Sequence, residues 1–143
     1  MESSANDCSR EILDVVPVVM RAIRAEMRAH REPGLSLAQF RTLLYINRTP
    51  GASLAQLAEH LGLTSATTSS MVEGLVERGL TSRADSPSDR RRITLSLSAD
   101  GEKSLDTARL AAQEMLSQKT ASMNDDERAI VFAAMQIMRS AFM

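Results

Sequence analysis

Hydrophobic residues in the middle of the chain follow two different spacings, one helical and one alternating. Residues 53–61 and 64–78 each place inward-facing side chains every three or four positions, which is the pattern of an amphipathic helix. Gly62 and Gly79 follow these stretches, and glycine at such a position commonly ends a helix in the left-handed conformation. The two inward faces consist of Leu54, Leu57, Ala58 and Leu61, and of Thr68, Met71, Val72 and Leu75. We therefore expect two helices joined by a tight turn.

The spacing changes to alternation after residue 92. Ile93, Leu95 and Leu97 alternate with hydroxyl residues, as in a strand that has one face buried. A shorter run at residues 80–84 precedes it, and the segment between them holds a Ser-Pro-Ser-Asp turn followed by three arginines. This pattern predicts a hairpin with a charged tip. Two helices and a hairpin in this order indicate a winged helix-turn-helix.

Helical spacing on both sides of this module predicts four more helices. Ser36 with Gln39, and Asn124 with Glu127, have the spacing of capping boxes, which open helices. The four helices are expected at residues 9–31, 36–48, 98–122 and 124–142. The predicted fold class is mainly α with a small antiparallel β-wing.

The beginning of the chain gives a weaker pattern. Residues 1–8 are polar and are expected to fray. Pro17 removes one helical hydrogen bond, so it should either kink the first helix or mark a later start.

The first and last predicted helices carry more apolar surface than one small domain can bury. We therefore expect a homodimer whose interface is largely apolar. Residues 9–34 and 100–143 would form the dimerisation region, and residues 36–99 the winged helix-turn-helix, within a single domain over 1–143.

Candidate DNA contacts lie on the second helix of the module and on the hairpin. Small side chains face outward near the start of that helix, where a recognition helix meets base edges. Arginine forks at a hairpin tip suit phosphates or a narrow minor groove. An exposed, hydroxyl-rich helix start is the alternative interpretation, because such residues favour that position anyway. The candidates are Ser65, Ala66, Thr67, Ser69, Ser70, Arg78, Asp89, Arg90, Arg91 and Arg92.

The distribution of charge agrees with DNA binding although the net charge is only -1. Residues 78–92 hold five arginines against two aspartates, whereas residues 100–127 hold seven acidic and three basic side chains. Positive charge is therefore concentrated in the segment that would face DNA.

The segment resembles the MarR (multiple antibiotic resistance regulator) family of winged-helix transcription factors. The resemblance rests on Asp89-Arg90-Arg91 and, after a short strand, on residues 97–101, Leu-Ser-Ala-Asp-Gly. It implies that Arg91 enters the minor groove and that Asp89 pairs with it and holds its geometry. It also implies a dimer that binds double-stranded DNA at a palindromic operator and acts as a repressor of genes for efflux, detoxification or aromatic-compound metabolism. One departure is Gly74, where many relatives carry a basic residue.

The resemblance further implies a cleft for a small effector between the dimer helices and the winged helix. Such effectors are typically phenolic or other aromatic, amphipathic compounds. An effector that favours the conformation unable to bind DNA would release the operator by shifting populations. The candidate lining residues are Met20, Met27, Phe40, Leu44, Tyr45 and Arg48. Taken singly, each fits an ordinary core residue better than a ligand contact.

Other functions remain as alternatives or are disfavoured. One branch of the family senses peroxides through a cysteine, so Cys8 could serve a redox-sensing regulator, although it is expected to precede the first helix. A winged helix that binds only proteins is a second alternative. Two distant histidines, with no Cys/His cluster and no phosphate-binding loop, predict no enzyme, no metal site and no cofactor. We see no signal peptide or membrane-spanning run and expect a cytoplasmic protein.

Overall fold

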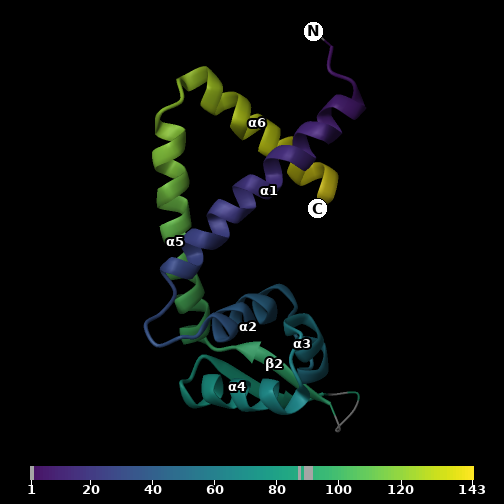
Figure 1. Cartoon of the computed structure of the whole chain (residues 1–143), viewed down its shortest axis with the longest axis vertical. Coiled ribbons are helices and arrows are strands. Elements are labelled where there is room, and N and C mark those ends of the chain that lie inside the picture. The colour runs from purple at the N-terminus through teal and green to yellow at the C-terminus, as the bar shows by residue number, and fades with distance from the viewer. Residues whose placement is uncertain (1, 87, 89–91) are drawn as a thin grey trace.

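The computed structural model describes residues 2–86, 88 and 92–143, and in them six helices and a two-stranded sheet form a small body with a long helical extension (Figure 1). The fold class, mainly α with a small β-wing, is confirmed. The elements are α1 (Ala5–Ala29), α2 (Leu37–Arg48), α3 (Leu54–Leu61), α4 (Ser65–Glu77), β1 (Thr81–Asp85), β2 (Ile93–Leu97), α5 (Ala99–Ala121) and α6 (Asp125–Phe142).

Capping side chains set where the helices begin. The predicted boxes at Ser36 and Asn124 are both present, and Ser53 opens α3 in the same way. In each box the cap side chain accepts a hydrogen bond from the third helical N–H, which otherwise has no partner in the helix. Gly62 ends α3 at φ 68°, as its position predicted.

The expected start of the first helix was wrong. α1 begins four residues earlier, because Ser4 and Asp7 form a further capping box with the backbone. Hydrogen bonds from the hydroxyl and the backbone N–H of Ser4 lower the pKa of the Asp7 carboxyl. Cys8 therefore lies within the helix and not before it, and Pro17 lies inside the same continuous helix.

The two strands pair antiparallel, with Thr81 opposite Leu97 and Asp85 opposite Ile93. The first strand is shifted by one residue from the expected 80–84. Leu95 is buried, and its N–H donates to the carbonyl of Ala52, 2.9 Å away. This bond ties the hairpin to the start of α3, so the wing is part of the body.

Helix α2 lies at the centre of the body and joins two hydrophobic clusters. Phe40 and Leu43 pack in the first cluster with residues of α1, α4 and α5, and Ile46 packs in the second. The second cluster also contains Leu57, Val72 and Leu95, which come from α3, α4 and β2. The body therefore holds α4 and the hairpin in a fixed relation to α2.

Gly74 offers a test of the packing of α4. A Cβ added to Gly74 would lie 3.5 Å from the side-chain nitrogen of Gln39, an ordinary van der Waals contact. Because glycine has lower helix propensity than alanine, we expect Gly74→Ala to raise the free energy of unfolding by about 0.5–1 kcal/mol. Urea unfolding followed by circular dichroism at fixed protein concentration measures it. A lower free energy of unfolding would contradict an unstrained contact at this position.

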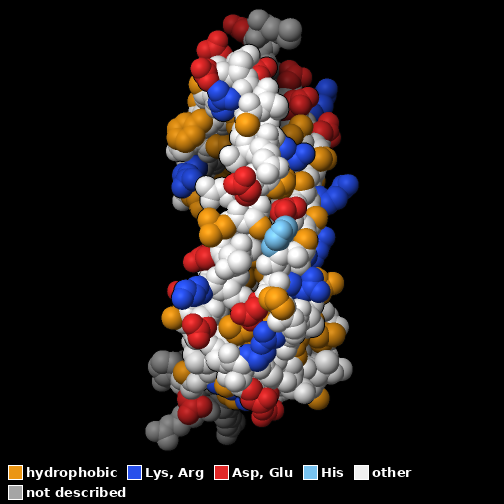
Figure 2. Space-filling view, turned by 90° about the vertical axis from the view of Figure 1, so that its left-hand side faces the viewer, with side chains coloured by type: hydrophobic (Ala, Val, Ile, Leu, Met, Phe, Trp, Pro, Cys, Tyr) orange, Lys and Arg blue, Asp and Glu red, His pale blue; other side chains and the backbone are white. Residues whose placement is uncertain are grey.

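Helices α1, α5 and α6 form the extension above the body (Figure 1). No residue of α6 is buried, and large apolar side chains such as Ile130 (68% exposed), Ile137 (69%) and Phe142 (75%) face outward. The first half of α1 exposes Leu13 and Val18 as well. Figure 2 shows apolar side chains among charged ones on the surface of this extension. In the single chain, these apolar faces have no covering element among the described residues.

None of the described helices combines the length and apolar composition that crossing a membrane requires.

Candidate nucleic-acid interface and adjoining cavity

The start of α4 presents an exposed face of small side chains. Thr64 caps the helix by accepting a hydrogen bond from the N–H of Thr67. Thr68, Val72 and Leu75 are buried and point into the body. The opposite side is therefore outward: Ser65, Ala66, Thr67 and Ser70 are exposed and Ser69 is half-buried. These are the five helix positions predicted to face DNA.

Arg83, which the sequence analysis did not select, joins this helix to the wing. Its guanidinium on β1 donates to the carbonyl of Ser69, 3.3 Å away. Its exposed place in a strand opposite Leu95 gave no sign of this partner, since the contact crosses 14 residues of chain. The bond links β1 of the wing to α4.

The tip of the wing is only partly within the described residues. Asp89, Arg90 and Arg91 lie outside them, so their predicted roles stay predictions. Arg92 is exposed, and its carbonyl accepts a hydrogen bond from the N–H of Ser86 at 2.8 Å. This bond continues the hairpin beyond the paired strands and places Arg92 at the base of the tip.

Arg78 lies at the opposite end of α4 from Thr64. Its guanidinium forms an ion pair with Glu32 at 2.7 Å and a longer hydrogen bond to the carbonyl of Pro33. These contacts tie the end of α4 to the loop between α1 and α2. Arg78 therefore has a structural contact away from the outward face of the helix start.

The winged helix-turn-helix is the part of the chain that matches a known protein family. Residues 34–92 match the model of the MarR family. This segment is similar to the MarR family. It runs from the loop before α2 to the base of the wing, so it contains the outward face of α4 and Arg83. No curated protein matches the sequence.

Solved structures extend the likeness to nearly the whole chain. The transcriptional regulator Tm0710 from Thermotoga maritima has a TM-score of 0.74 and 19% identity over 95% of this chain and 94% of its own. The PcaV regulator from Streptomyces coelicolor, in complex with its natural ligand, has a TM-score of 0.54 and 20% identity over 99% of both chains. A mutant of S. aureus MepR bound to an oligodeoxyribonucleotide has a TM-score of 0.59 and 20% identity, over 99% of this chain and 100% of its own. At these identities the likeness shows that the MarR-type fold includes the helical extension.

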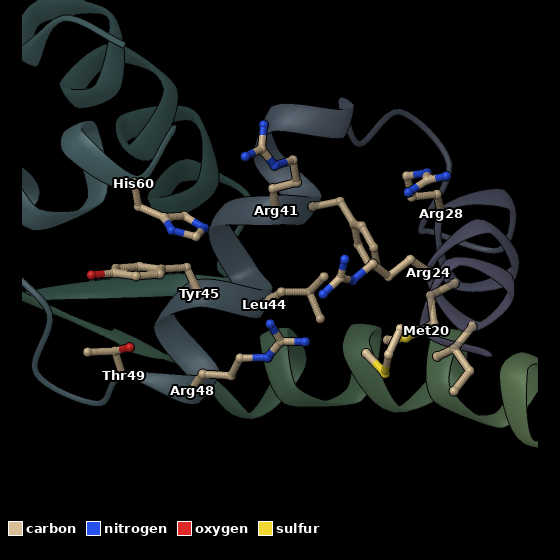
Figure 3. A pocket seen from close by; sticks show the side chains of 12 residues that line it. Met20, Arg24, Arg28, Arg41, Leu44, Tyr45, Arg48, Thr49 and His60 are labelled. Atoms are coloured by element: carbon tan, nitrogen blue, oxygen red, sulfur yellow. The ribbon is translucent and has the colours of Figure 1, made fainter. Parts of the chain in front are cut away.

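A cavity of about 590 Å³ lies between α1, α2 and the end of α3 (Figure 3). All six residues predicted to surround an effector line it: Met20, Met27, Phe40, Leu44, Tyr45 and Arg48. Phe40 and Met27 also belong to the first hydrophobic cluster, so they have a structural role as well. The structure brings the six together in one place, while their use by an effector remains a proposal.

Six other lining residues were not selected from the sequence: Ile23, Arg24, Arg28, Arg41, Thr49 and His60. Arg24 and Arg28 lie on the side of the first helix away from its apolar stripe, so the sequence pattern predicts a solvated face, and this interpretation is incomplete. Both are exposed, but both lie on the wall of the cavity. The four-residue spacing of Arg24 and Arg28 placed them on one face of a helix, and only the position of α2 shows what that face meets.

Tyr45 and His60 form one side of the cavity. Their rings stack with centroids 4.4 Å apart and an angle of 22° between planes. Figure 3 shows the pair at the side away from α1. Since His60 belongs to α3 and Tyr45 to α2, the stack connects the cavity directly to the helix that precedes α4.

Cys8 is a free, exposed thiol in the first turn of α1. Its position within that helix removes one argument against a redox role. Redox sensing through Cys8 stays an alternative hypothesis.

Proposed function

We propose that this protein is a sequence-specific DNA-binding transcriptional regulator. The observation that carries the proposal is the outward face at the start of α4, held beside the wing by Arg83 within the segment that matches the MarR family. Hydroxyl groups at a helix start can donate to phosphates and accept from bases, and a threonine methyl can contact a thymine methyl. The arginines of the wing, Arg90, Arg91 and Arg92, would supply phosphate or minor-groove contacts. The structure of a MepR mutant with an oligodeoxyribonucleotide supports this use of the fold.

The functional unit in this proposal is a homodimer. The exposed apolar faces of α1 and α6 are too extensive for a stable monomer surface and would be covered by the same helices of a second copy. A two-fold dimer presents two α4 helices, so it would bind a palindrome whose half-sites are about 10 bp apart.

An effector bound in the cavity between α1 and α2 would regulate DNA binding. The cavity touches a helix of the dimer region and, through Tyr45 and His60, the helix before α4. An effector that favours one relation between these parts would change the spacing of the two α4 helices and release DNA. The likeness to PcaV with its natural ligand supports effector control, and repression is the mode that we propose.

DNA binding is tested by fluorescence anisotropy with DNA from upstream of the gene, in a salt series. Ser70 is exposed on the outward face of α4, so Ser70→Glu would place a carboxylate against phosphates. We expect this variant to bind the preferred fragment about tenfold or more weakly, because a like charge is brought into the interface. Arg91→Ala should weaken binding about tenfold and lower the salt slope by about one.

Ser117→Glu is the matched control, since Ser117 is also an exposed helical serine but lies on α5. It should leave affinity unchanged. Binding that is weak, indifferent to sequence and unaffected by Ser70→Glu and Arg91→Ala would contradict the proposal and favour a protein-binding winged helix.

A further inference from the structure

The cavity between α1 and α2 has an unusual charge composition. Four of its lining residues are arginines, namely Arg24 and Arg28 on α1 and Arg41 and Arg48 on α2. Among the residues that the structure describes, no aspartate or glutamate lines it. Among the described residues, none of the four guanidinium groups forms an ion pair, whereas Arg78, Arg109 and Arg128 each do. The permanent positive charge of this cavity therefore has no counterpart within the described part of the chain.

Two of these arginines approach from opposite helices. Figure 3 shows the guanidinium groups of Arg24 and Arg48 directed into the space between α1 and α2, around Leu44. Met20 and Leu44 line the same space with apolar surface, and Phe40, which is buried in the core, lines it as well. An occupant must therefore offer an apolar body as well as groups that satisfy guanidinium donors.

We infer that the effector of this protein is an aromatic or similarly flat apolar compound with two anionic groups, one held by Arg24 and the other by Arg48. The inference rests on the proposed function, since it names the ligand class of the cavity in which we place the effector. A carboxylate or phosphate accepts two parallel hydrogen bonds from one guanidinium fork. Both arginines are exposed, so water solvates their charges in the chain without a ligand. A compound with one anionic group would displace water from the second arginine without giving it a partner. A neutral phenol leaves both without one, and covering unpaired charges is unfavourable.

The two anionic groups also explain how binding would be transmitted. α1 belongs to the helical extension, and α2 is the central helix of the winged-helix body (Figure 1). Without an anion, the positive charges of Arg24 and Arg28 repel those of Arg41 and Arg48 across the cavity. A dianion replaces this repulsion by two attractive contacts and links the extension to the body. Since His60 of α3 forms a wall of the same cavity, such a link reaches the helix that precedes α4.

Isothermal titration calorimetry of the full chain, without DNA, tests this inference. The probes share one ring: phthalate, isophthalate and terephthalate as dianions, benzoate as the monoanion and benzamide as the neutral compound. At least one dicarboxylate should bind about tenfold more tightly than benzoate, and benzamide should bind most weakly. Arg24→Gln and Arg48→Gln should each weaken the dicarboxylate about tenfold and leave it no better than benzoate.

Arg21→Gln is the matched control, because Arg21 lies one turn from Arg24 on α1 but does not line the cavity. It should bind the dicarboxylate as the wild type does, and circular dichroism should show all three variants folded. Three results would overturn the inference: equal affinity for benzamide and the dianions, equal loss in Arg21→Gln, or no binding of any dicarboxylate at millimolar concentration. The titration contains no DNA, so a negative result would contradict anion binding and leave the proposed DNA binding intact. A negative anisotropy experiment would contradict DNA binding and leave anion binding unaffected.

Discussion

Gly101→Ala is expected to lower the free energy of unfolding by about 3 kcal/mol. Gly101 is buried in the first turn of α5, where that helix packs on the backbone between α4 and β1. A Cβ at this position would lie 2.1 Å from the carbonyl oxygen of Leu80, a distance that no real contact allows. The same carbonyl accepts a hydrogen bond from the N–H of Ser98, the residue that caps α5. The backbone must therefore shift, and both the bond and the packing of α5 on the body are lost or weakened.

Urea unfolding at one fixed protein concentration measures this loss, and Gly74→Ala is its matched control. Both variants add the same methyl group to a helical glycine, yet only Gly101 has a backbone atom in the way. The two free energies of unfolding should change in opposite directions. An unchanged value for Gly101→Ala would mean that α5 can move away from Leu80 without cost.

Ile137→Asp is expected to convert the proposed dimer into monomers at micromolar concentration. Ile137 is 69% exposed on α6 and lies on the same face as Ile130, seven residues earlier. An aspartate in the centre of an apolar interface would have to lose its water without gaining a partner, which costs several kcal/mol. Light scattering after gel filtration should give 15.6 kDa for this variant and about twice that mass for the wild type.

Gln136→Asp is the control for charge alone. It adds the same carboxylate to the neighbouring position, which points about 100° away around the helix, toward the polar side that includes Arg128 and Arg139. This variant should remain dimeric. A wild-type mass of a single chain, or dissociation of both variants alike, would contradict an interface built on the Ile130 and Ile137 face.

Predictions from local sequence signals differ in outcome from predictions about contacts between distant segments. Signals that lie within a few residues were interpreted correctly: the boxes at Ser36 and Asn124, the left-handed Gly62, and the alternation that forms β2. The miss at the start of α1 belongs to the same kind. Ser4 and Asp7 form the box that the sequence analysis passed over, because aspartate replaces the more usual glutamate or glutamine three residues after the cap.

Contacts between side chains on distant segments could not be predicted from the sequence. Arg78 was selected as a DNA contact, and its pairing with Glu32 depends on a loop 46 residues earlier in the chain. The contact between Arg83 and Ser69 and the stack of Tyr45 on His60 have the same origin. None of these pairs leaves a periodic pattern, because each partner lies on a different element.

The cavity shows most clearly what the sequence predicts and what only the packing of the helices decides. Family resemblance grouped its apolar members, such as Met20, Phe40 and Leu44, as candidates for an effector site, and in the structure they line one cavity. The sequence also placed Arg24 and Arg28 on one face of a helix, because a helical period of 3.6 residues is a local property of the backbone. Which element that face meets is a property of packing among helices far apart in the chain. By itself, the sequence determined the elements, the winged-helix order and the concentration of positive charge. Only the tertiary structure decided that arginines from two helices share one cavity, where none of them forms an ion pair with another described residue.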